Sequence, residues 1–128
     1  MSTTDTVLEQ VRQAFERPTG GFVRVVDRLI RLCPESGLHF DHKQRLCRIS
    51  LVGNGDGEKV EVTLRGFRAM LARFAVLCDE YRPGTFSSYG GDAEFVSPER
   101  PGEVFRAVFV NTTAQQCLTL TRSGDDNA

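Results

Sequence analysis

Hydrophobic side chains recur at steps of three and four residues between Gly66 and Tyr81, and this spacing predicts one long amphipathic helix. The Arg82-Pro83-Gly84 sequence ends it. Segments on both sides of this helix instead alternate apolar and polar residues, which is typical of half-buried strands. The pattern therefore predicts a helix packed on a sheet through one apolar stripe: Phe67, Met70, Leu71, Phe74, Leu77, Cys78 and Tyr81.

Two shorter helices are predicted before the strands. A capping box at Thr6–Glu9 opens the first helix, and its apolar face consists of Val7, Leu8, Val11, Ala14 and Phe15. The second is predicted over Phe22–Leu32, with these residues directed inward: Val23, Val26, Leu29, Ile30 and Cys33. Glycine and proline follow each helix and end it.

Six strands are predicted, three before and three after the long helix: 38–41, 45–52, 59–64, 94–97, 103–111 and 115–122. The glycine-rich segment Gly53–Gly57 accepts positive φ and predicts a hairpin between the second and third strands. Glu103–Asn111 is apolar on both faces, which predicts a central strand covered on both sides. Its two rows are Phe105, Ala107 and Phe109 against Val104, Val108 and Val110.

The resulting order, α-α-β-β-β-α-β-β-β, predicts a small single α+β domain with a mostly antiparallel sheet and about three helices. A chain of 128 residues has the usual size of one domain. We expect this domain over residues 1–122. The last six residues, 123–128, are small and polar, and we expect them to form a disordered tail.

Composition narrows the class of protein. A net charge of −1 gives no general attraction to nucleic acid or to an anionic membrane. We find no secretory signal and no apolar run of the roughly 18 residues that a membrane span needs, so we expect a cytoplasmic protein. The four cysteines are widely spaced, and we expect them to be reduced, with the first three buried and the last partly exposed: Cys33, Cys47, Cys78 and Cys117.

Motifs for chemistry are lacking. His39 and His42 are the two imidazoles of the chain, and neither accompanies a nucleophile motif. Zinc could use them together with Cys33 and Cys47, but the spacing of these four residues matches no specific zinc motif. We therefore predict no enzyme activity, no cofactor and no metal.

Two surfaces are candidates for binding. The segment Thr85–Gly102 is rich in glycine, serine and proline, and its candidate binding residues are Phe86, Tyr89, Asp92 and Arg100. The alternative interpretation is that Phe86 and Phe95 belong to the core, with a plain hairpin turn at 89–92. The second surface is a stripe on one helix face, which could bind an acidic protein or nucleic acid or simply be solvated: Arg24, Arg28 and Arg31.

These observations favour a non-enzymatic cytoplasmic protein-binding domain of the adaptor, chaperone or inhibitor/immunity type. In element order the chain is similar to small bacterial accessory proteins such as secretion chaperones and immunity proteins, an analogy of architecture that does not fix function. The alternative is a small-molecule or nucleotide-binding domain with a pocket between the Gly66–Tyr81 helix and the sheet. A protein partner is expected and nucleic acid is not, and the sequence leaves the oligomeric state open.

Overall fold

The computed structural model describes residues 3–16, 21–53, 59–84, 86–87 and 89–125. It contains three helices: α1 (Thr3–Glu16), α2 (Gly21–Leu32) and α3 (Leu64–Tyr81). Seven strands form one sheet: β1 (Leu38–Lys43), β2 (Leu46–Leu51), β3 (Val60–Val62), β4 (Phe86–Ser87), β5 (Gly90–Val96), β6 (Glu103–Asn111) and β7 (Gln115–Asp125). The predicted α+β fold and element order are confirmed, with the two-residue β4 as an addition.

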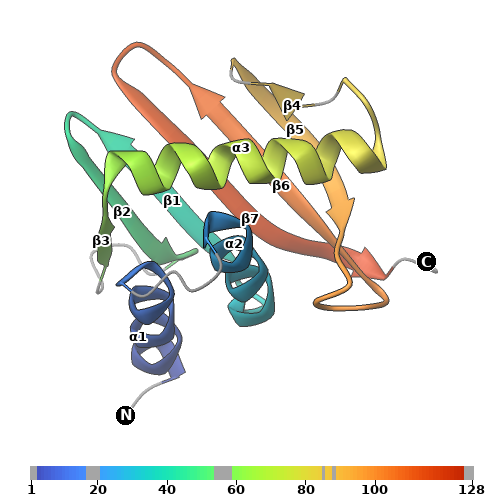
Figure 1. Ribbon diagram of the computed structural model, residues 1–128, viewed down its shortest axis with the longest axis horizontal. Coiled ribbons are helices and arrows are strands. Elements are labelled where there is room, and N and C mark those ends of the chain that lie inside the picture. The colour runs from blue at the N-terminus through green and yellow to red at the C-terminus, as the bar shows by residue number, and fades with distance from the viewer. Residues whose placement is uncertain (1–2, 17–20, 54–58, 85, 88, 126–128) are drawn as a thin grey trace.

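All neighbouring strands of the sheet are antiparallel, in the order β3-β2-β1-β7-β6-β5-β4. The last strand, β7, thus pairs with the first strand, β1. Helix α3 connects the two outermost strands, β3 and β4. Seven strands about 4.8 Å apart span roughly 29 Å, and the 18 residues of α3 give a length of about 27 Å. Helix α3 is therefore long enough to cross the whole sheet, as it does in Figure 1.

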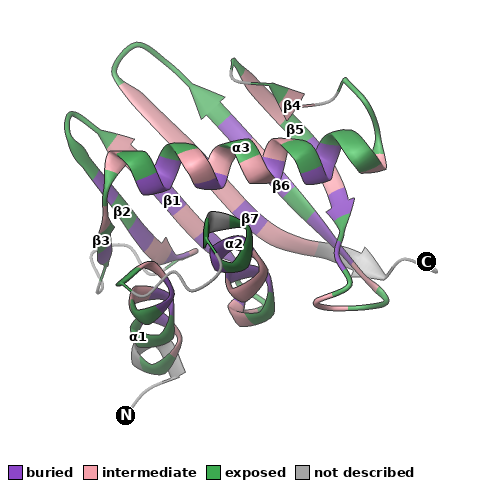
Figure 2. Cartoon of the chain, in the orientation of Figure 1, coloured by how far each residue is buried: buried purple, intermediate pink, exposed green. Residues whose placement is uncertain are grey.

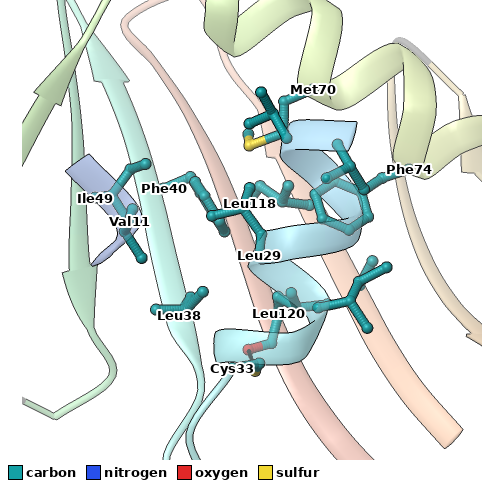
Figure 3. Packing of buried hydrophobic residues seen from close by; sticks show 14 of the residues in the cluster. Val11, Leu29, Cys33, Leu38, Phe40, Ile49, Met70, Phe74, Leu118 and Leu120 are labelled. Atoms are coloured by element: carbon teal, nitrogen blue, oxygen red, sulfur yellow. Dashed lines mark hydrogen bonds between the residues drawn. The ribbon is translucent and has the colours of Figure 1, made fainter. Parts of the chain in front are cut away.

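The core lies between the sheet and the three helices, which occupy the same face (Figures 1 and 2). The predicted stripe of α3 is confirmed, since Phe67, Met70, Phe74, Leu77 and Cys78 are buried while Leu71 and Tyr81 are half-buried. Beneath α3, Leu29 of α2 lies beside Leu118 and Leu120 of β7 (Figure 3). One apolar layer therefore holds all three helices on the sheet.

All three helices begin earlier than predicted, α2 by one residue, at Gly21, and the other two by more. Helix α1 begins at Thr3, so the predicted capping residue Thr6 lies inside the helix. Helix α3 begins at Leu64, because the Thr63 hydroxyl accepts a hydrogen bond from the Gly66 amide at 3.0 Å and caps the first turn. In both cases the apolar pattern located the helix but did not show where its first turn begins.

The inward face of α2 also differs at one position. Val23 was predicted inside but is 50% exposed, whereas Val25 is buried. Val23 lies at the margin of the apolar stripe, in the first turn of the helix. The other inward predictions for α2 are confirmed.

The second face of the sheet lies open, and this corrects the prediction for β6. Phe105, Ala107 and Phe109 point toward the helices and are buried, but no helix covers the opposite row in the described part of the chain. On that row Val110 is 52% exposed and Val108 is half-buried, whereas Val104, at the register shift between Val104 and Phe105, is buried as predicted. Valine suits a pleated strand whether or not it is covered, so an apolar residue there was a weak sign of burial.

The C-terminal strand is longer than predicted. Strand β7 runs to Asp125, where it pairs with Glu103 at the start of β6. Residues 123–125 of the predicted tail therefore belong to the sheet, and residues 126–128 lie outside the described part. No helix within the described ranges is long and apolar enough to cross a membrane.

Candidate binding surface and pocket

The segment 85–102, predicted as a long adaptable connection, is mostly a hairpin. Strand β4 pairs with β5 through Phe86↔Gly91 and Ser87↔Gly90, and β5 covers 90–96 rather than the predicted 94–97. Gly90 has φ +144°, and a Cβ there would lie 3.2 Å from the Phe109 carbonyl oxygen, so glycine suits this close approach. The glycines therefore serve a tight strand pairing. Thr85, the predicted first residue of the segment, lies outside the described residues.

The aromatic residues of this hairpin divide between core and surface. Phe95 is fully buried, and Phe86 is half-buried with its ring stacked on Phe109 at 5.8 Å between centroids. Tyr89, beside the turn, is 87% exposed. The interpretation that these two phenylalanines belong to the core is thus correct for Phe95 and correct in part for the half-buried Phe86. Tyr89 is exposed enough to contact a partner.

Asp92 is engaged within the sheet. It lies on the open face of β5, where its carboxylate accepts two hydrogen bonds from the Arg106 guanidinium, one of them at 2.7 Å from Nε. These bonds hold the pKa of Asp92 below its usual value. The two charges of this ion pair offset each other where β5 lies beside β6.

Arg100 forms hydrogen bonds within the protein. Its Nε donates to Glu103 at 2.5 Å, and its Nη1 donates to the Cys33 carbonyl oxygen at 3.0 Å, just after the end of α2. Arg122 adds a further bond to Glu103 at 2.8 Å. The Arg122 and Arg100 bonds hold the pKa of Glu103 below its usual value. Arg100 thus joins α2 to β6, and its predicted role in partner binding stays a prediction.

The arginine stripe on α2 is partly engaged as well. Arg24 and Arg31 are exposed and Arg28 is half-buried. Arg31 forms an ion pair with Glu99 from the 97–102 connection, with 3.2 Å between Nε and Oε1. Such an exposed ion pair contributes little to the free energy of unfolding. Because Glu99 offsets one positive charge, the stripe attracts an acidic partner less strongly than three unpaired arginines would. A binding role for this stripe stays a prediction.

A pocket of about 320 Å³ lies between α3 and the sheet. The alternative hypothesis placed a small-molecule site in this region. The pocket is lined by one flank of α3 and by three strands. The lining residues are Arg68, Leu71, Ala72, Ala75, Phe86, Ser87, Phe109 and Gln116. Except for Phe86, sequence reasoning did not name these as site residues. The available signal was the pair of alanines beside Leu71, because small residues on the flank of a helix leave space that bulky residues would fill.

The histidines do not form a site together. His39 faces the open side of the sheet, where its Nδ1 lies 3.1 Å from the Thr119 hydroxyl. His42 faces α3, where its ring contacts Phe67 and its Nδ1 lies 3.0 Å from Gln116 Oε1. An odd spacing along one strand places them on opposite faces. Among the described residues no group of three or more His, Cys, Asp or Glu side chains could hold a metal ion.

The cysteines are free thiols, and three of them are buried as expected. Burial raises the pKa of Cys33 to about 11 and that of Cys78 to about 12. Cys117 is half-buried on the open face, where burial and the nearby Asp41 carboxylate raise its pKa. A thiol with a raised pKa is a poor nucleophile at neutral pH, so none of these three sites has the character of a catalytic cysteine.

No protein-family model matches this chain, and a search of curated proteins found no match. Two features of the molecule bear on its function. One is the edge of the β4–β5 hairpin with the exposed Tyr89. The other is the pocket beside α3.

Proposed function

We propose that this chain is a non-enzymatic protein-binding domain, of the adaptor, chaperone or inhibitor type, that pairs with an extended segment of a protein partner along the outer edge of β5. The observation that supports this is the length of β4. Strand β4 pairs with Gly90 and Gly91 only, so residues 92–96 have β6 on one side and no strand on the other in the described part of the chain. A strand edge without a neighbouring strand is a place where an extended segment of a partner can add to the sheet by backbone pairing.

Exposed side chains with apolar surface lie at the two ends of β5. Tyr89 precedes β5 and is 87% exposed, and Val96 ends the strand and is 36% exposed. Residues 92–96 of β5, which have no strand on their outer side, rise by roughly 16 Å, enough to pair with an extended segment of about five residues. Backbone pairing along the edge would supply affinity, and Tyr89 would supply an amphipathic anchor of the kind found at binding hot spots.

The proposal places the domain in the bacterial cytoplasm. The free cysteines support a reducing compartment, since thiols persist there. The bacterial setting rests on the analogy of element order alone.

Photo-crosslinking tests this proposal. A benzophenone amino acid replaces Tyr89 in the protein expressed in its source cells, and in a control it replaces Val76, which is 44% exposed on α3. We expect a discrete adduct from position 89 and none from position 76. Adducts of equal yield from both positions, or none from position 89, would contradict the proposal.

The partner identified in this way allows two quantitative measurements. Tyr89→Ala should weaken its binding by about 2 kcal/mol or more, as for an aromatic anchor, and should change the free energy of unfolding by less than about 1 kcal/mol, as for an exposed side chain. Hydrogen exchange should show new protection at alternate amides of 92–96, because an added strand pairs with every second residue. Protection confined to the Arg24, Arg28 and Arg31 face would place the binding site there instead.

A further inference from the structure

The pocket beside α3 combines an apolar body with polar groups at its mouth. Leu71 and Ala75 of α3 form one wall, and the stacked rings of Phe86 and Phe109 form another. Its volume of about 320 Å³ lies at the lower end of the usual range for small-molecule sites, roughly 300–1,000 Å³. This size suits a molecule of one or two rings better than a nucleotide.

Arg68 is the cation of this pocket, and its charge is unmatched. It is exposed on α3 and lines the pocket, yet it has no hydrogen bond or ion pair with any described residue. By contrast, Arg106 is bound to Asp92, and Arg122 is bound to Glu103. An unpaired guanidinium beside an apolar wall offers a ligand carboxylate two parallel hydrogen bonds in a partly dehydrated place.

Gln116 supplies a fixed polar group on the opposite side. Its Nε2 donates to Asn111 Oδ1 at 3.1 Å, and its Oε1 lies 3.0 Å from His42 Nδ1. The amide is therefore held in one orientation before any ligand arrives, which lowers the entropic cost of binding. The polar lining consists of one cation and two neutral side chains, Gln116 and Ser87, so it matches a single negative charge rather than the several charges of a polyphosphate.

We propose that this pocket binds a small molecule with an apolar, ring-containing body and one carboxylate, the carboxylate at Arg68 and the body between α3 and the Phe86 and Phe109 rings. The site does not rest on the protein-binding function proposed above. It uses the helix-covered face of the sheet, whereas the proposed partner strand uses the outer edge of β5.

The test uses 1-naphthoate as the probe and its neutral analogue 1-naphthylmethanol as the matched control. Amide chemical shifts of the ¹⁵N-labelled protein report the binding site and affinity. We expect 1-naphthoate to bind with a dissociation constant on the order of 1 mM or tighter, and to shift the amides of Leu71, Ala72, Ala75 and Phe109. The alcohol should bind at least about tenfold more weakly, because it cannot pair with the guanidinium.

Two arginine variants separate the role of Arg68 from general charge. Arg68→Gln should weaken 1-naphthoate binding about tenfold and leave the alcohol unchanged, whereas Arg65→Gln, one turn earlier on α3 and also exposed, should change neither. Ala72→Phe, at an exposed position of the lining, should abolish binding of both molecules by filling the pocket.

Three results would overturn the proposal: equal affinity for acid and alcohol, equal effects of the two arginine variants, or shifts located away from α3 and β6. A lack of 1-naphthoate binding at 10 mM, a concentration about tenfold above the expected dissociation constant, would also overturn the proposal. Each measurement is made on the isolated chain, so the result does not depend on a protein partner.

Discussion

Removing the ring of Phe74 should lower the free energy of unfolding substantially. Phe74 is fully buried, and its ring lies between Phe40 and Phe95, at 6.4 Å and 5.7 Å between centroids. Phe→Ala at buried positions costs about 3–5 kcal/mol through lost transfer energy and the cavity left behind. The tilted ring pairs contribute about 0.5–1.5 kcal/mol each beyond their buried area. We therefore expect Phe74→Ala to lower the free energy of unfolding by about 4 kcal/mol.

Urea denaturation measures this loss. With a slope of about 2 kcal/mol per molar urea, the midpoint should fall by about 2 M. The matched control is Val76→Ala, on the same helix but 44% exposed, which should cost less than about 1 kcal/mol. If Phe74→Ala does not fold, Phe74→Leu gives the same test at a smaller cost of about 1–2 kcal/mol. A Phe74 variant as stable as the Val76 variant would mean that α3 does not pack on the sheet through this stripe.

Three further predictions concern separate parts of the molecule. Thr63→Ala should lower the free energy of unfolding, measured by urea denaturation, by about 1 kcal/mol, because the hydroxyl caps the first turn of α3. Thr63→Ser keeps a hydroxyl and should lose much less. An alanine variant as stable as the wild type would refute the cap. At pH 8 a thiol reagent should modify Cys117 first, because Cys33, Cys47 and Cys78 are buried; in denaturant all four thiols should react, and elemental analysis should find no zinc. The pKa of Glu103 is lowered in the folded state, so the stability it contributes is present above the unfolded pKa of about 4.3 and is lost as pH falls through the lower folded value. Glu103→Gln should flatten the fall of the melting temperature between about pH 5 and pH 3, and an unchanged slope would contradict this.

Periodicity predicted the helices and most strands because each buries one face. The steps of three and four in α3, and the alternation of Cys47, Ile49 and Leu51 in β2, follow directly from the geometry of a one-sided layer. Strand β4 was beyond this reasoning, since two residues show no period. The open face behind β6 was also missed, because β-branched residues favour strands on either side of a sheet.

The candidate surfaces were predictable to different degrees. The exposure of Tyr89 followed from its place beside two glycines, which leave it few neighbours. Arg68 and Gln116, in contrast, lie 48 positions apart in the sequence and face one pocket only because α3 crosses the sheet above β7. No local sequence pattern shows that Arg68 and Gln116 lie close together, because this depends on the order of the strands in the sheet.

Strand β4 lines the pocket and also lies next to the proposed partner site on β5, and this determines how the two sites can be told apart. Phe86 and Ser87 line the pocket, while Tyr89 and the outer edge of β5 come later in the sequence. A change in β4 itself would disturb both sites and decide between neither. Arg68 lies on α3 and touches only the pocket, whereas Tyr89 lies beyond β4 and is not part of the pocket lining. Substitutions at these two residues therefore test the two proposals separately, and either proposal can fail while the other holds.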